Sequence, residues 1–119
     1  MQYGIEALLG KTLKAVVNNG DEILFSTENG EVFKMWHDQS CCESVYVEDI
    51  CGDLDDLVGT PILRAEERSE NDPDMEYDIG CWTFYELATI KGSVTIRWYG
   101  SSNGYYSIDV SVGLIDHVS

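Results

Sequence analysis

A histidine, two adjacent cysteines and a carboxylate lie close together in the stretch HDQSCCES, which begins at His37. Side chains of these types can ligate a metal, or the histidine can act as the base that holds a cysteine as its thiolate. The spacing argues against zinc, because Cys41 and Cys42 are adjacent whereas zinc sites use cysteines separated by roughly two to four residues. A looser set that adds Cys51 and Cys81 requires the fold to bring their strands together. We therefore expect no metal and no cofactor.

A cysteine-dependent enzyme is the catalytic alternative. His37 precedes the cysteine pair by four or five residues, a spacing that permits a thiolate and imidazole pair without requiring one. The sequence contains no Gly-x-Ser-x-Gly, His-Glu-x-x-His or phosphate-loop pattern. We interpret HDQSCCES as a loop whose polar groups brace the backbone or face a pocket, and the chain as a binding protein rather than an enzyme.

A second candidate site is the stretch RWYGSSNGYY, in which Arg97, Tyr99 and Tyr105 are expected on one face of a hairpin. Arginine and aromatic side chains can pair with a phosphate and stack on a base, so a nucleotide signal is a candidate ligand. Cross-strand aromatic packing that only stiffens the sheet is the competing explanation. The predicted ligand pocket combines both stretches: His37, Asp38, Cys41, Cys42, Glu43, Arg97, Tyr99, Asn103 and Tyr105.

The net charge of −15, from 22 acidic and 7 basic side chains, repels phosphate backbones and anionic lipid surfaces and attracts basic proteins. We therefore expect no direct nucleic-acid binding, no membrane binding, and a basic protein partner. Residues 66–80 are predicted to form a mobile, solvated acidic loop. The predicted acidic partner surface in this loop consists of Glu66, Glu67, Glu70, Asp72, Asp74, Glu76 and Asp78.

The remaining pattern predicts one domain over residues 1–119, of the α+β class and dominated by a curled antiparallel β-sheet. Short β-rich runs alternate with Gly and Asn-Gly turns, as in hairpins. In SVTIRWY the apolar residues Val94, Ile96 and Trp98 share one face. YYSIDVSV is predicted to be a strand in which Tyr106 also faces inward. One short N-terminal helix in YGIEALLG, which ends at Gly10, and one helical turn after Asp53 complete the prediction.

No apolar run approaches the roughly 18–20 residues of a membrane span, and MQYGIEALLG lacks the basic and apolar regions of a signal peptide. We therefore expect a soluble, cytoplasmic protein with free cysteine thiols. The sequence leaves the oligomeric state open and is compatible with a homo-oligomer.

Four motifs in this order, HDQSCCES, DICGDLDDLVG, WTFYELATIKGSVTIRW and GSSNGYYS, resemble an uncharacterised family of small acidic proteins encoded by bacteriophages and by bacterial genomes. The resemblance covers roughly Gly10 to Val112. It implies a phage or prophage context, in which small acidic proteins often bind and block host machinery, and it places such a protein in the host cytoplasm. It implies no activity.

The leading hypothesis is a non-enzymatic phage or prophage protein that inhibits or sequesters a host factor, such as one of antiviral defence, through its acidic surface. A solubilising role is the competing explanation for those charges. The alternatives are a protein that captures a nucleotide signal at the RWYGSSNGYY face, a cysteine-dependent enzyme, and a structural component of a virion.

Overall fold

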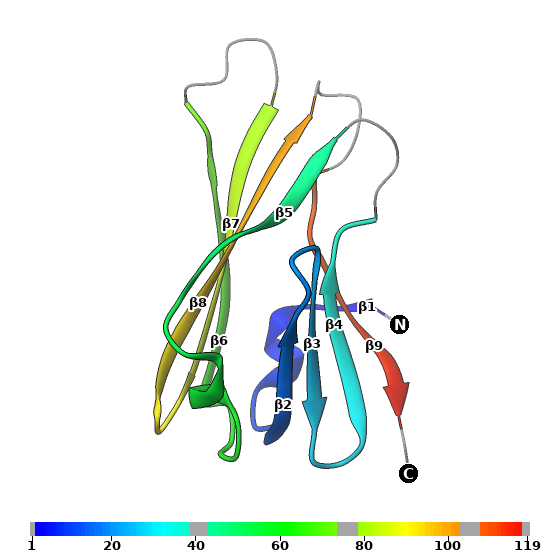
Figure 1. Ribbon diagram of the computed structural model, residues 1–119, viewed down its shortest axis with the longest axis vertical. Helices are drawn as coiled ribbons and strands as arrows, with labels where there is room; N and C mark the ends of the chain where they lie inside the picture. The colour runs from blue at the N-terminus through cyan, green and yellow to red at the C-terminus, as the bar shows by residue number, and fades with distance from the viewer. Residues whose placement is uncertain (1, 39–42, 74–78, 103–107, 118–119) are drawn as a thin grey trace.

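Two antiparallel β-sheets pack face to face (Figure 1). The structure is a computed structural model that describes residues 2–38, 43–73, 79–102 and 108–117. The five-stranded sheet has the order β1-β9-β4-β3-β2, and the four-stranded sheet has the order β5-β8-β7-β6. The strands are β1 (Gln2–Tyr3), β2 (Leu13–Asn18), β3 (Glu22–Thr27), β4 (Glu31–Trp36), β5 (Ser44–Cys51), β6 (Arg64–Asn71), β7 (Ile79–Thr89), β8 (Gly92–Ser102) and β9 (Ser111–His117).

Apolar side chains from both sheets fill the space between them. The predicted alternation in SVTIRWY is confirmed, because Val94, Ile96 and Trp98 are at most 1% exposed. Other buried members of this core come from both layers, and they include Leu13, Ile23, Phe25, Phe33, Met35, Ala65, Leu87 and Val112. Removing this apolar surface from water is the main stabilising contribution to such a fold.

The predicted α+β class was wrong, since the described residues contain no α-helix and the fold is all-β. The predicted helices are single turns of 3-10 helix, η1 (Ile5–Leu8) and η2 (Leu54–Leu57). Segments this short cannot offset the cost of nucleating an α-helix, whereas a 3-10 turn is a common connector. The predicted caps are confirmed: Gly10 has a φ of +79°, and Asp53 accepts a hydrogen bond from the backbone N–H of Asp55 at 3.0 Å.

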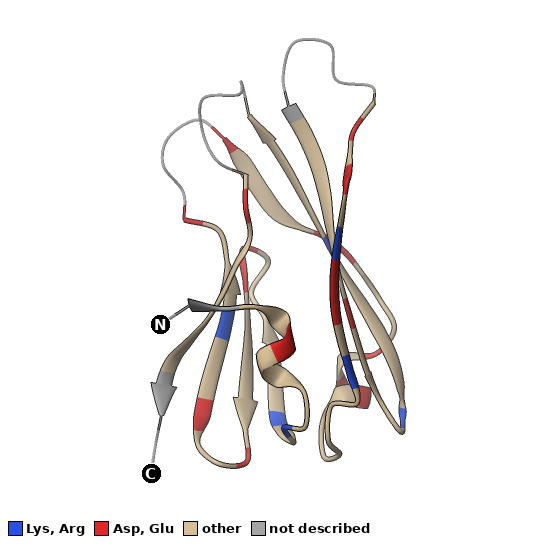
Figure 2. Cartoon of the chain, turned by 180° about the vertical axis from the view of Figure 1, so that it is seen from behind, with Lys and Arg blue, Asp and Glu red and all other residues tan. Residues whose placement is uncertain are grey.

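The predicted acidic loop over residues 66–80 was wrong for the part that the structure describes. Residues 66–71 belong to strand β6, which lies at the edge of its sheet and pairs with β7 from Arg64 opposite Ala88 to Asn71 opposite Cys81. Charged residues of both signs follow each other along this edge (Figure 2). Edge strands often carry charges because these discourage pairing with other chains, and so β6 lacks the apolar alternation of an interior strand.

The strand predicted in YYSIDVSV is only partly confirmed. Strand β9 begins at Ser111, so Ile108 and Val110 precede it, while Tyr106 lies outside the described residues. No helix in the described part of the chain is long and apolar enough to cross a membrane.

Replacing Trp98 by Ala is expected to lower the free energy of unfolding by about 3–5 kcal/mol, because the buried ring packs in the core and its indole N–H points to the Met35 sulfur at 3.0 Å. Urea denaturation measures this loss. Trp82→Ala, on the outer face of the same sheet, is the control and should cost less. Equal losses for the two variants would contradict this assignment of the faces.

Candidate functional site

The inner face of the four-stranded sheet changes from apolar to polar along β6 and β7. Near the start of β6, Ala65 pairs with Leu87 and both are buried in the core. The next inward-facing pairs along the two strands are polar. Those pairs are Glu67 with Tyr85, Ser69 with Thr83, and Asn71 with Cys81. One end of the space between the sheets is therefore a dry core, and the other end presents hydroxyl, thiol and carboxyl groups.

These polar side chains form one wall of a cleft between the sheets, which we call the interior cleft. Its lining residues are His37, Asp38, Glu67, Ser69, Cys81, Thr83, Tyr85 and Ile108–Ser111. The cleft has a volume of about 620 Å³, within the range of roughly 300–1,000 Å³ that is typical of ligand sites.

Gly100 lets the opposite wall approach the four-stranded sheet closely. A Cβ atom at this position would lie only 2.9 Å from the Cβ of Ile108 and 3.2 Å from Cγ2 of Val45. Because Gly100 has no side chain, the segment that begins at Ile108 packs directly against β8. This packing positions the Asp109 carbonyl group at the edge of the interior cleft.

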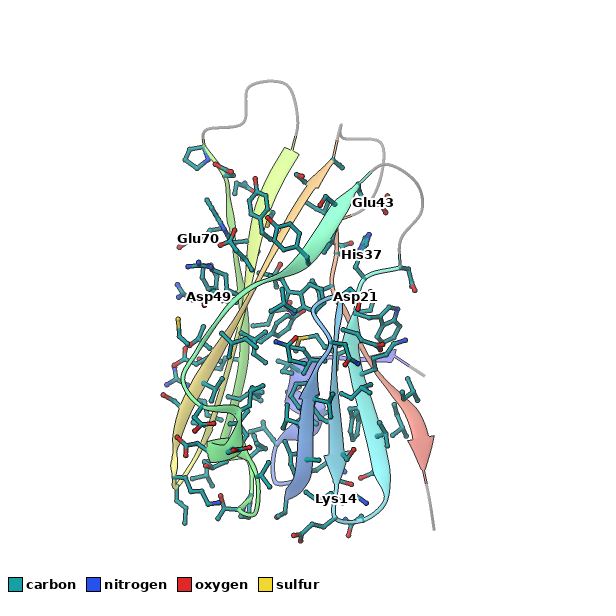
Figure 3. All side chains as sticks on the ribbon, viewed as in Figure 1. Lys14, Asp21, His37, Glu43, Asp49 and Glu70 are labelled. Atoms are coloured by element: carbon teal, nitrogen blue, oxygen red, sulfur yellow. The ribbon has the colours of Figure 1, made fainter. Side chains whose placement is uncertain are left out.

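His37 and Glu43 form a buried pair that joins the segment after β4 to the segment before β5 (Figure 3). Nε2 of His37 lies 2.8 Å from Oε2 of Glu43, and Nδ1 lies 2.7 Å from the carbonyl oxygen of Asp109. The side chains of His37 and Glu43 are 4% and 0% exposed. The imidazole therefore connects the segments on either side of the β4–β5 connection with the distant segment that contains Asp109.

The partners of the His37 ring determine how many protons the pair holds. A carbonyl oxygen can only accept, so the Nδ1–H of His37 donates to Asp109. The second ring nitrogen faces a carboxyl group, and the proton between them lies either on the ring or on Glu43. In both cases the pair is electrically neutral as a whole, and neither ring nitrogen is free to accept a proton from a substrate.

Tyr85 places a buried hydroxyl group at the interior cleft. The side chain is 0% exposed, and its Oη has no partner at ordinary hydrogen-bond distance and angle in the described part of the structure. The Glu67 carboxylate on the neighbouring strand is close enough to interact with this hydroxyl, and burial, followed by that interaction, raises the pKa of Tyr85 well above its usual value. The phenol is therefore uncharged at neutral pH. A buried hydroxyl without a well-placed partner lowers stability.

Cys81 shares the interior cleft with His37 but does not resemble an activated nucleophile. Burial raises the pKa of the Cys81 thiol, and its Sγ lies 3.4 Å from the carbonyl oxygen of Trp82. Catalytic cysteines instead have a lowered pKa and a basic neighbour. Cys51 lies on β5, with Sγ 3.6 Å from Oδ2 of Asp49. Among the described residues, no three His, Cys, Asp or Glu side chains converge as metal ligands would.

The structure separates the residues of the predicted ligand pocket. His37 and Asp38 line the interior cleft and Glu43 is paired behind it, whereas Arg97 and Tyr99 belong to the alternate, outward-facing positions of β8. The other members lie outside the described residues: Cys41, Cys42, Asn103 and Tyr105. The described part of the pocket therefore consists of two surfaces on opposite faces of the four-stranded sheet.

The outer face of the four-stranded sheet carries an aromatic cluster of Tyr46, Trp82 and Tyr99. The Tyr99 ring centroid lies 6.2 Å from that of Tyr46 and 5.3 Å from that of Trp82. The Tyr99 hydroxyl donates to Asp72 at 2.7 Å, which raises the pKa of Tyr99 to about 12. This cross-strand packing is the arrangement that the competing explanation for RWYGSSNGYY predicts.

Carboxylates already surround the arginine of this face. Nε of Arg97 lies 2.8 Å from Oε1 of Glu48, and its NH2 lies 3.7 Å from Oδ2 of Asp49. A phosphate group would have to displace these carboxylates to pair with the guanidinium.

The described residues of the predicted acidic partner surface also lie on different faces of the four-stranded sheet. Glu67 lines the interior cleft, whereas Glu66 and Glu70 occupy the alternate positions of β6, opposite Glu86 and Trp82. Asp72 follows the strand and accepts the hydrogen bond from Tyr99. The remaining predicted members lie outside the described residues: Asp74, Glu76 and Asp78.

Sequence reasoning missed the polar wall of the interior cleft. No faces were predicted for CWTFYEL, in which the large aromatic residues Trp82 and Phe84 face outward. The short turn between β7 and β8 is the signal from which the polar wall could have been predicted. The turn pairs Thr89 with Gly92, and counting back along both strands from this pair places Tyr85 opposite the inward-facing Ile96. This register sets Cys81, Thr83 and Tyr85 inward.

Fold and cleft together define a two-layer, all-β protein with a polar cleft at one end of its interior. The chain belongs to a family described as a domain of unknown function, DUF7448, whose model matches residues 6–112. This result agrees with the resemblance to an uncharacterised family. No curated protein and no solved structure matches the chain significantly.

Replacing Glu43 by Ala is expected to lower the free energy of unfolding by about 3 kcal/mol, because it leaves a buried imidazole without its partner. Glu43→Gln should cost less, since its amide can donate a hydrogen bond to Nε2 of His37. Urea denaturation at neutral pH measures both losses. A loss for Gln as large as that for Ala would contradict the role of this hydrogen bond.

Replacing Tyr85 by Phe is expected to leave the free energy of unfolding unchanged or to raise it by about 1 kcal/mol, because the substitution removes a buried hydroxyl group that has no partner at ordinary hydrogen-bond geometry. Thermal and urea denaturation measure the change. Thr89→Val is a matched control, because the Thr89 hydroxyl does donate to the Asp56 carbonyl and its removal should destabilise. A loss above about 1 kcal/mol for Tyr85→Phe would show that the hydroxyl is satisfied in solution.

Proposed function

We propose that this protein is a non-enzymatic binding protein of phage or prophage origin that captures a basic host protein through β6 and thereby inhibits or sequesters it. The observation that carries the proposal is the position of β6 at the edge of its sheet, with every side chain from Glu66 to Asn71 exposed. The resemblance to phage-encoded proteins supports the proposed origin, and it makes a factor of antiviral defence the first partner to test.

Strand β6 has the features of a docking edge for an extended basic segment. An edge strand keeps one row of its backbone N–H and C=O groups unpaired, and an added strand can bond to them. Arg64 is paired with Glu66 and Glu86. NH1 of Arg68 lies 3.8 Å from Oε1 of Glu70. Glu67, by contrast, has no Lys or Arg partner among the described residues. The overall charge of −15 adds long-range attraction for a basic partner.

Protection against aggregation is the competing explanation for the charges on β6. Lysine is especially common where edges are protected by charge. Here the edge strand carries three glutamates and two arginines and no lysine, and one of its carboxylates faces the interior cleft. A role in protection alone predicts that removing these charges promotes self-association without changing any binding event.

A second candidate function is the capture of a nucleotide at the outer face, which the cluster of Tyr46, Trp82 and Tyr99 favours because aromatic rings stack on bases. This function requires the Arg97 guanidinium to exchange Glu48 and Asp49 for phosphate. Arg97→Gln should then abolish nucleotide binding, while variants of β6 should bind as the parent does.

The main proposal is tested with a triple variant of the edge strand: Glu66→Gln, Glu67→Gln and Glu70→Gln. The free energy of unfolding should change by less than about 0.5 kcal/mol for each exposed substitution. Affinity for the basic partner should fall roughly tenfold at low salt, since each exposed ion pair contributes up to about 1 kcal/mol. Binding of the parent protein should weaken as salt rises. Capture from host lysate followed by calorimetry measures both effects.

The control is a second triple variant with the same change in charge on other exposed positions: Asp21→Asn, Glu28→Gln and Asp55→Asn. It should bind the partner as the parent does. A partner that binds the edge variant and the parent equally, at low and at high salt, would remove β6 as the binding surface. Equal weakening of partner binding in both triple variants would show that the effect depends only on the net charge of the protein.

A further inference from the structure

We propose that the interior cleft binds a guanidinium or primary ammonium group. The inference deepens the proposed function and rests on it for the source of that group, which is an arginine or lysine side chain of the basic segment docked on β6. The cleft thus supplies the specific contact that a charged edge alone lacks.

The charges around the interior cleft favour a cation. Asp38, Glu67 and Asp109 contribute carboxylates, and no Lys or Arg is among the lining residues that the structure describes. His37 adds no net charge, because it forms a neutral pair with Glu43. An anion or a phosphate would meet only repulsion here, whereas a guanidinium or ammonium would meet its preferred partners.

The hydrogen-bonding groups at the cleft wall point to the same ligand. Glu67 lies opposite Tyr85 on the neighbouring strand and has no basic partner. The Tyr85 Oη is buried and has no partner at ordinary hydrogen-bond geometry, and its neighbouring carboxylate is that of Glu67. A bound N–H group can donate to the phenol oxygen and to Glu67 together, while the phenol keeps its own proton for a carboxylate. Binding would therefore give a buried hydroxyl the well-placed partner that it lacks in the free protein.

The position of the interior cleft fits a side chain that arrives along β6. Glu67 and Ser69 belong both to this edge strand and to the cleft wall. A segment paired with β6 would alternate its side chains between the two faces of the sheet. One set would meet Glu66 and Glu70 on the outer face, and the other would point toward Glu67 and the cleft. Its volume of about 620 Å³ is ample for one long basic side chain.

The test is a titration of the purified full chain with N-acetyl-arginine methylamide and N-acetyl-lysine methylamide, followed by backbone amide NMR signals. N-acetyl-citrulline methylamide is the matched neutral probe, because it keeps the shape of arginine without its charge. We expect saturable shifts at Glu67, Thr83 and Tyr85 with both cationic probes and none with the citrulline probe. Equal shifts with the citrulline probe would overturn the proposal.

Three single variants locate the site. Glu67→Gln and Tyr85→Phe should each weaken binding of the arginine probe at least about fivefold. Glu66→Gln is the matched control, since it removes the same charge from the neighbouring residue on the other face, and it should bind as the parent does. Equal affinities for Glu67→Gln and Glu66→Gln would overturn the proposal.

The same variants separate this inference from the proposed function. Suppose that a basic partner is captured and that Glu66→Gln and Glu70→Gln weaken its binding. If Glu67→Gln and Tyr85→Phe then bind this partner as the parent does, the cleft proposal fails and the proposed function stands. If the free cationic probes bind at the cleft but the triple edge variant, which includes Glu67→Gln, captures every basic partner normally, the cleft binds cations, while the proposed role of β6 and the docked segment as the source of the cation both fail.

Discussion

The pairing of β7 with β8 is the constraint on which the rest of the structure depends. A short turn between Thr89 and Gly92 fixes this register, which runs from there to Ile79 opposite Ser102. Because successive side chains point to opposite faces, a slip of one residue would bring Trp82 and Phe84 into the interior and expel Tyr85 and Leu87. The register thus decides at once which residues form the core, which line the interior cleft and which form the outer aromatic cluster.

The interior combines two environments that have opposite effects on stability. At one end, residues such as Leu87 and Ile96 are completely buried and stabilise the contact between the sheets. At the other end, the fold buries the pair of His37 and Glu43 and leaves the Tyr85 hydroxyl without a partner at ordinary hydrogen-bond geometry. Burying polar groups costs free energy, so the apolar end stabilises a cleft that would otherwise be unfavourable.

The edge strand β6 connects the acidic composition of the chain with the interior cleft. Its outward-facing Glu66 and Glu70 and its cleft-facing Glu67 come from one short run of sequence, yet they face different surroundings. Exposed carboxylates attract a partner over a distance, whereas a carboxylate beside a buried hydroxyl can make directed hydrogen bonds. The two proposals assign these two tasks to the two faces of the same strand.

The sequence by itself determined most of the strands, the turns of the hairpins β2-β3, β3-β4 and β7-β8, the Asp53 cap and the inward face of β8, because each depends on neighbours in the chain. The hairpin predicted in RWYGSSNGYY was wrong, because β8 and β9 belong to different sheets. It could not determine that Ile5–Leu8 and Leu54–Leu57 are only 3-10 turns, or that residues 66–71 pair as an edge strand. Only the tertiary structure brought His37, Glu43 and the Asp109 carbonyl together and set Arg97 on the opposite face of the sheet. Contacts of that kind depend on how two sheets pack and on which strands become edges, and local sequence patterns carry no information about either.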